Sequence, residues 1–237
     1  MLRRDFNATA VQPRRPQAVS QDMRETVVLI HGLGRTAASM LPLALAARRR
    51  GYRVANWRYR SNLRTIGENA AVFARDVAPR LASAPAVHFV THSLGGIIVR
   101  QFLATHSLPN LGRVVMLAPP NGGSEVADVL QQPLCVVKPL RELGTGDGSV
   151  PCALPPADFP LGVIAGSRSH IPLFSRWMDR VPNDGVVAVE KTKLAGMTDF
   201  VVLHRTHTFL PWASDAIGQV FCFLEKGAFQ RGFPSNH

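Results

Sequence analysis

The stretch that decides the fold reads Val-His-Phe-Val-Thr-His-Ser-Leu-Gly-Gly over residues 87–96. The apolar run 87–90 predicts a buried strand, and the apolar residues 97–105 predict a helix. Ser93 then lies on a sharp turn between the two, where its hydroxyl is held clear of the backbone, and Gly95 and Gly96 let strand and helix pass closely. Because a serine hydroxyl is a poor nucleophile without an adjacent base, this turn indicates attack on an acyl carbonyl only if such a base is nearby.

Strand and helix patterns alternate on both sides of this turn. Such alternation predicts an α/β fold with a mostly parallel twisted sheet and helices on both of its faces. The expected strands cover residues 27–30, 54–57, 87–90, 114–118, 161–165 and 201–203. The expected helices cover residues 36–50, 67–82, 97–105 and 214–224.

The chain has 237 residues, which suits one domain with an insertion. We assign residues 25–237 to this domain and predict a poorly ordered arm, or an added strand, over residues 1–24. Arg3-Arg4-Asp5-Phe6 is similar to a twin-arginine export signal, but no apolar run follows it. No apolar stretch approaches the ~20 residues that span a bilayer. A cytoplasmic location is therefore expected.

The formal net charge is +11, and it comes almost entirely from arginine. Such a charge predicts weak association with anionic surfaces. The arginines are spread along the chain and accompany no nucleic-acid-binding motif, so no specific nucleic-acid partner is expected. A non-catalytic basic binding module for anionic partners stays open as an alternative. The oligomeric state is not indicated.

The three cysteines do not have the spacing of a metal cluster. Cys135 and Cys152 either form a bridge or stay free, and Cys222 is expected in the core. We expect neither a metal nor a cofactor.

Candidate partners for Ser93 follow other predicted strands. His31-Gly32-Leu33-Gly34 follows strand 27–30, Asp184 lies beyond strand 161–165, and His207 follows strand 201–203. Ligands of open α/β sheets bind beyond the carboxyl ends of the strands, so we expect these residues to gather there. The order Ser, Asp, His along the chain is that of one known catalytic triad.

Other residues of the same types compete for these roles. Asp199 precedes a strand, which places it at the wrong edge of the sheet, and Asp158 and Asp179 are weaker candidates. His204 is the rival of His207. His31 and His92 are expected to support the two site loops and not to act as bases.

Five motifs in this order resemble those of the α/β-hydrolase fold and, within it, the compact lipases of the esterase/lipase group. The resemblance covers residues 26–225. The motifs are His-Gly-Leu-Gly at 31–34, Thr-His-Ser-Leu-Gly-Gly at 91–96, Ala-Pro-Pro-Asn-Gly-Gly-Ser at 118–124, Asn-Asp-Gly-Val-Val at 183–187 and His-Thr-Phe-Leu at 207–210.

The resemblance implies a serine hydrolase that cleaves carboxylic esters through an acyl-enzyme. Ser93 would be the nucleophile, His207 its base and Asp184 the acid that orients the base. Backbone amides of Leu33 and Leu94 would bind the oxyanion. The substrate would be a small-molecule or lipid ester. An acyl thioesterase or acyltransferase would use the same triad.

Two further features bear on this reading. Thr91 stands where the usual elbow has a glycine, so a β-branched side chain crowds the turn.

Residues 121–160 lack clear periodicity and occupy the place of a lid in many hydrolases. We therefore predict a lid-like insertion, which either forms a wall of the acyl site or only covers the fold. Residues 171–178 either line the acyl pocket as well or close the core.

Overall fold

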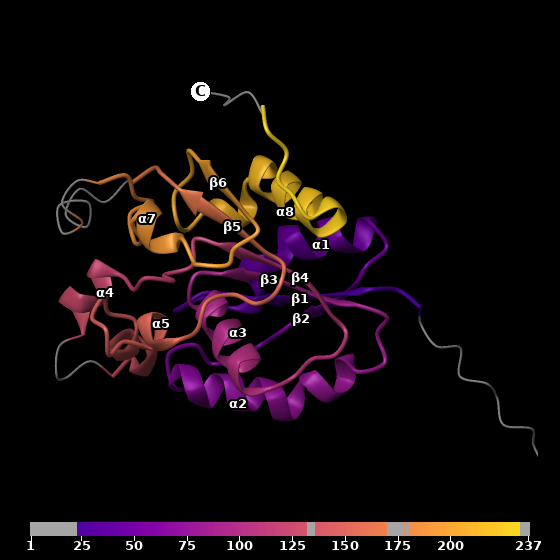
Figure 1. Ribbon diagram of the computed structural model, residues 1–237, viewed down its shortest axis with the longest axis horizontal. Helices are drawn as coiled ribbons and strands as arrows, with labels where there is room; N and C mark the ends of the chain where they lie inside the picture. Colours follow the sequence, from indigo (N-terminus) through magenta and orange to yellow (C-terminus); the bar gives the residue numbers. More distant parts are fainter. Residues whose placement is uncertain (1–22, 132–135, 170–177, 179–180, 233–237) are drawn as a thin grey trace, which may run out of the picture.

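The computed structural model describes residues 23–131, 136–169, 178 and 181–232. Its strands form one six-stranded sheet in the order β2-β1-β3-β4-β5-β6, and every neighbouring pair is parallel (Figure 1). This confirms the predicted α/β fold. The strands are β1 (Thr26–Ile30), β2 (Arg53–Asn56), β3 (Val87–His92), β4 (Leu111–Leu117), β5 (Leu161–Gly166) and β6 (Asp199–Leu203).

Helices cover both faces of the sheet. In Figure 1, α1 (Leu41–Arg49) and α8 (Ser214–Lys226) lie above the sheet, and α2 (Ile66–Asp76) and α3 (Leu94–Thr105) lie below it. Successive residues of β1 pack into the two different cores, Val27 on the side of α1 and α8 and Val28 on the side of α2 and α3. Because both faces are buried, the strand is a continuous apolar run and not an alternating one.

Two predicted helices are each divided into two pieces. The helix expected over residues 36–50 begins with a 3₁₀ turn, η1 (Ala37–Met40), before α1. The helix expected over residues 67–82 ends at Asp76 and is followed by a second 3₁₀ turn, η2 (Ala78–Leu81). Pro79 has no amide hydrogen to donate, so the α-helical ladder cannot continue through it.

The segment 121–160 contains short helices where the sequence shows little periodicity. These are α4 (Glu125–Leu130), η3 (Lys138–Glu142) and α5 (Val150–Ala153). Elements of four to six residues are too short to show a helical repeat in the sequence. Figure 1 shows α4 and α5 at the end of the sheet toward which the arrowhead of β5 points, which is the carboxyl end of the strands. We call residues 121–131 and 136–160 the cover segment.

A buried arginine holds both ends of the cover segment. Arg100 of α3 donates from Nη1 to the backbone and side-chain oxygens of Asn121 at 3.3 and 3.2 Å. Its Nη2 donates to the carbonyls of Leu154 and Pro155 at 3.0 and 3.2 Å. Burial lowers the pKa of Arg100 to about 10. The helix that starts at the serine turn therefore also anchors the cover segment.

Several expectations concern residues outside the described ranges: most of the N-terminal arm, Cys135 and residues 171–177. Cys152 is an exposed free thiol. Cys222 is only half-buried and not a core residue, because its neighbours Phe221 and Phe223 take the inward positions of α8. None of the helices in the described ranges has the length and apolar character needed to cross a membrane.

Candidate active site

Ser93 lies on a strained turn between β3 and α3. Its backbone angles are φ 52° and ψ −123°, in a region that side-chain-bearing residues rarely occupy. The turn is held because the Ser93 amide donates to the carbonyl of Leu117 and the Gly96 amide donates to the carbonyl of Ser93, both at 2.9 Å. The strained conformation directs the side chain away from the sheet and into a pocket.

Close packing explains the two glycines that follow. A Cβ on Gly95 would lie 2.5 Å from the carbonyl oxygen of Ile30, so only glycine fits where α3 crosses β1. A Cβ on Gly96 would lie 3.3 Å from Oγ1 of Thr91. Thr91 is fully buried in β3, where it pairs with Ile30 and Met116. The bulk of Thr91 at the position of the usual glycine is therefore accommodated by the missing side chain at Gly96.

Asp184 and His207 reach Ser93 from distant parts of the chain. The Ser93 hydroxyl donates to Nε2 of His207 at 3.0 Å, and Nδ1 of His207 donates to Oδ2 of Asp184 at 2.7 Å. The other carboxylate oxygen, Oδ1, accepts the amides of Val186 and Val187 at 3.0 and 2.8 Å. Because Asp184 keeps a hydrogen on Nδ1, the lone pair of Nε2 faces the serine.

The competing candidates lie elsewhere. His204 is exposed, and its Nδ1 is 3.5 Å from the hydroxyl of Ser167. Asp199 begins β6 at the opposite edge of the sheet, where it accepts the amides of Phe200 and Phe229. Asp158 is exposed, and Asp179 lies outside the described residues. Of the candidates that the structure describes, it brings together Ser93, Asp184 and His207.

Two backbone amides near Ser93 are candidates to bind an oxyanion, that of Leu33 in the loop after β1 and that of Leu94 at the start of α3. A turn is closed by the Arg35 amide, which donates to the carbonyl of Gly32 at 3.3 Å, and Gly34 takes a positive φ of 65°. Neither the Leu33 amide nor the Leu94 amide donates to any residue in the described ranges. Leu94 is also the first residue of α3, where the helix dipole favours negative charge. Two such amides can bind a developing oxyanion.

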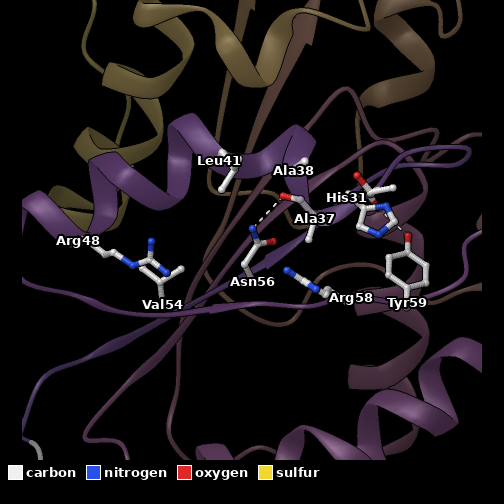
Figure 2. A pocket seen from close by; sticks show the side chains of 10 residues that line it. His31, Ala37, Ala38, Leu41, Arg48, Val54, Asn56, Arg58 and Tyr59 are labelled. Atoms are coloured by element: carbon white, nitrogen blue, oxygen red, sulfur yellow. Dashed lines mark hydrogen bonds between the residues drawn. The ribbon is translucent and has the colours of Figure 1, made fainter.

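An aromatic stack supports the loop that follows β1. The Tyr59 hydroxyl donates to the carbonyl of His31 at 2.6 Å, and the two rings stack with centroids 4.3 Å apart (Figure 2). Trp57 stacks on the other side of Tyr59 at 4.4 Å. Burial raises the pKa of Tyr59 and lowers that of His31. Both side chains therefore stay neutral, and their contacts with each other and with the loop agree with a structural role.

Figure 2 draws the cleft that His31 and Tyr59 border. It has a volume of about 710 Å³ and lies between η1, α1 and the edge strand β2. Ser93 is not among its lining residues, so this cleft is separate from the serine site.

His92 ties the serine turn to the loop of His207. Its Nε2 donates to the carbonyl of His207 at 2.9 Å, and the two rings are 4.8 Å apart. Burial, and next the nearby His207, lowers the pKa of His92 well below its usual value. The ring is neutral, and its hydrogen lies on Nε2 because a carbonyl can only accept. Its contacts agree with the supporting role expected from the sequence.

Ser93 and His207 border a cavity of about 230 Å³. The cover segment supplies most of its apolar wall, with Val126, Ala127, Leu130, Leu140 and Leu143. Four hydrogen bonds around the site had no signal in the sequence. They are the bonds of Ser61 and Asn62 to the Gly34 amide, of Ser124 to the carbonyl of Val186, and of Arg35 to Thr208.

Comparisons with known proteins find a matching family model and several similar structures. A model of the Alpha/beta hydrolase family matches residues 27–223. The mature lipase BlEst2 of Bacillus licheniformis is similar in structure, with a TM-score of 0.63 and 19% identity over 83% of this chain and 89% of that chain. The metagenomic carboxyl esterase MGS0156 has a TM-score of 0.56 and 19% identity over 84% of this chain and 68% of that chain.

No curated protein sequence matches the chain. The family model covers most of the chain, including all six strands of the sheet apart from the first residue of β1. The chain therefore belongs to the alpha/beta hydrolase family.

Proposed function

We propose that the protein is a serine hydrolase that cleaves carboxylic esters through an acyl-enzyme. The observation that carries this proposal is the chain of hydrogen bonds from Ser93 through His207 to Asp184, at 3.0 and 2.7 Å. A serine hydroxyl bonded to a neutral imidazole, which is in turn oriented by a buried carboxylate, is the arrangement that activates this nucleophile.

The proposed reaction has two halves. In the first half, Nε2 of His207 takes the proton of Ser93 as Oγ attacks the ester carbonyl, and the amides of Leu33 and Leu94 bind the oxyanion. The bond from the acyl carbon to the alcohol oxygen then breaks, and His207 gives its proton to that oxygen. In the second half, water repeats the attack with His207 as base, which releases the acid and restores Ser93.

The apolar wall of the cavity favours a carbon chain on the acyl side. Side chains of α4 and η3 line the cavity that Ser93 borders, and Val186 and Val187 add to the same wall. We therefore propose that the cover segment forms the acyl-binding wall. The lid-like role of this segment stays a prediction.

The proposal is tested with p-nitrophenyl esters from acetyl to palmitoyl, together with acyl thioesters. Ser93→Ala should lower kcat/KM by at least about 10³-fold, because it removes the nucleophile. Ser107→Ala changes an exposed serine beyond the end of α3 and serves as the matched control. Equal rates for the wild type and Ser93→Ala would overturn the assignment. Faster cleavage of thioesters than of esters would favour the thioesterase alternative.

A fluorophosphonate probe tests the same serine without a chosen substrate. It should label the wild type and the Ser107→Ala variant but not Ser93→Ala. A second pair of variants tests the base: His207→Ala should abolish turnover, whereas His204→Ala should retain it. Loss of activity in the His204 variant alone would overturn the role of His207.

A further inference from the structure

A second cavity adjoins the one that contains Ser93. It has a volume of about 150 Å³ and shares Arg35, His92 and Thr208 with the first. Its remaining lining residues are Ser39, Phe209, Pro211 and Trp212. The two cavities therefore meet beside the candidate catalytic residues, but most of their lining residues are different.

We place the departing alcohol at the second cavity, which begins at the two residues that follow His207. This step rests on the proposed function, in which His207 gives its proton to the alcohol oxygen. The alcohol part of the ester must then lie against the imidazole. Thr208 and Phe209 directly follow His207 and line the second cavity, whereas the carbon-chain wall of the cover segment belongs to the first.

Arg35 supplies an uncompensated positive charge at this junction. Its Nη2 donates to Oγ1 of Thr208 at 2.8 Å, which is the one hydrogen bond that its guanidinium makes within the described ranges. A guanidinium has five N–H donors, so most of them are available to a ligand. None of the described residues that line either cavity is an aspartate or a glutamate.

The nearby titratable groups do not cancel this charge. The Asp184 side chain is fully buried, and both of its oxygens are occupied by His207 and by backbone amides. His92 is buried and neutral, and it donates its one hydrogen to the carbonyl of His207. An incoming alcohol group therefore meets the charge of Arg35 and, among the residues that the structure describes, no opposing carboxylate.

The second cavity is also lined by two aromatic residues, Phe209 and Trp212. The indole Nε1 of Trp212 donates to the carbonyl of Ser39 at 2.9 Å, which fixes the ring. Trp212 remains 55% exposed and Phe209 61% exposed, so both rings have free surface to offer a ligand. A cation and aromatic rings in one cavity suit a small group that carries a negative charge on a short carbon skeleton.

We propose that the cavity lined by Arg35, Phe209 and Trp212 binds the alcohol part of the ester and selects alcohols that carry a phosphate a few bonds from the ester oxygen. Acylglycerol phosphates are the substrate class with this chemistry. Hydrolysis adds water across the bond between acyl carbon and glycerol oxygen. It releases a carboxylic acid and glycerol 3-phosphate, with the proton from His207 on the glycerol oxygen.

Three butyryl esters with the same glycerol skeleton test the proposal: 1-butyrylglycerol, 1-butyrylglycerol 3-phosphate and 1-butyrylglycerophosphocholine. The measured quantity is the ratio of kcat/KM for the phosphate ester to that for the neutral ester. We expect this ratio to exceed about ten in the wild type, because a charge-assisted hydrogen bond contributes about a factor of ten or more. Equal rates for the phosphocholine and phosphate esters would show that the subsite accepts a lipid headgroup. A lower rate for the phosphocholine ester would show that the subsite selects phosphate monoesters.

Variants assign the selectivity to Arg35. Arg35→Met should lower the ratio about tenfold, mainly through KM, and Arg35→Lys should restore part of it. Arg49→Met removes the same net charge from the exposed end of α1 and should leave the ratio unchanged. A ratio near one in the wild type, or one unchanged by Arg35→Met, overturns the proposal.

A measurement on the wild type alone keeps the test valid if the Arg35 variants do not fold. Glycerol 3-phosphate should inhibit hydrolysis of the neutral ester more strongly than glycerol does, and salt should weaken this inhibition. Equal inhibition by the two compounds would also overturn the subsite. Failure of the subsite leaves the loss of activity in Ser93→Ala intact, whereas absence of hydrolysis of every ester would overturn the proposed function itself.

Discussion

The serine turn and the cover segment meet at the same pocket but are held by different kinds of contact. The turn is fixed by backbone packing: Gly95 lies against the carbonyl of Ile30, and Ser93 donates its amide to Leu117 in the next strand. The cover segment has backbone bonds as well, such as that from the Gly122 amide to the carbonyl of Lys191 at 2.8 Å, but it also depends on side chains that bind backbone groups, chiefly those of Arg100 and Asp128. Asp128 accepts the amide and the hydroxyl of Thr145.

Because the contacts differ, we expect the geometry of the nucleophile and the shape of the substrate pocket to respond differently to substitutions. Backbone packing tolerates almost no change, so the geometry of the nucleophile is tightly constrained. Side-chain bonds can be lost one at a time, so the shape of the pocket can change while the nucleophile stays in place. The following predictions test this separation between the two regions, from the largest expected effect to the smallest.

Asp184→Asn should lower kcat by about 10⁴-fold while the fold persists. An amide can donate to Nδ1, which would move the imidazole hydrogen to Nε2 and remove the lone pair that faces Ser93. Steady-state kinetics with a p-nitrophenyl ester measure the effect. Asp158→Asn replaces an exposed carboxylate and should keep full activity. A loss of less than tenfold in Asp184→Asn would show that another acid serves the base.

Gly95→Ala should destabilise the protein by about 3 kcal/mol, because the new methyl group would lie 2.5 Å from the carbonyl oxygen of Ile30. Gly67→Ala is the matched control, since a Cβ there meets nothing within 4 Å and alanine favours the helix α2. Urea denaturation measures both variants. Equal stabilities of the two variants would contradict the close crossing of α3 and β1.

Arg100→Met should cost about 2 kcal/mol of stability, because the carbonyls of Asn121, Leu154 and Pro155 lose a donor. Hydrogen exchange should become faster across the cover segment and stay unchanged at the serine turn. Arg49→Met, on the exposed end of α1, is the control for loss of charge. Faster exchange at residues 91–96 would break the proposed separation between the two regions.

His92→Gln should remove part of the acid sensitivity of the fold. Burial lowers the pKa of His92 in the native state, so below pH 6.5 the unfolded chain binds a proton that the native state does not. The free energy of unfolding then falls by up to about 1.4 kcal/mol for each pH unit below 6.5, and above that pH this group has no effect.

Urea denaturation at pH 7.5 and pH 5.5 measures this difference. The wild type and His204→Gln, which changes an exposed histidine, should lose about 1 kcal/mol more than His92→Gln on acidification. Equal losses in all three proteins would show that His92 takes up its proton in the native state.

The fold and the three central side chains could be predicted from sequence because each depends on neighbours along the chain. Ser93 and His207 follow apolar strands within a few residues, and a parallel sheet brings such positions to one edge. Asp184 follows its strand at a greater distance but lies in a turn-forming stretch.

The supporting contacts could not be predicted in this way. Arg100 binds carbonyls up to 55 residues away, and Tyr59 binds the carbonyl of His31 across 28 residues. A carbonyl is present at every position, so no residue pattern marks the one that is bound. The helices of the cover segment escaped prediction for another reason, since none completes two turns.

The hydrogen bond from His92 to the carbonyl of His207 has a consequence for motion. His92 and Ser93 are neighbours on the same strand end, yet His92 holds a residue 115 positions away. A displacement of that strand end therefore carries the nucleophile and the base in the same direction. We expect this coupling to keep the distance from Oγ to Nε2 nearly constant when the strand end moves.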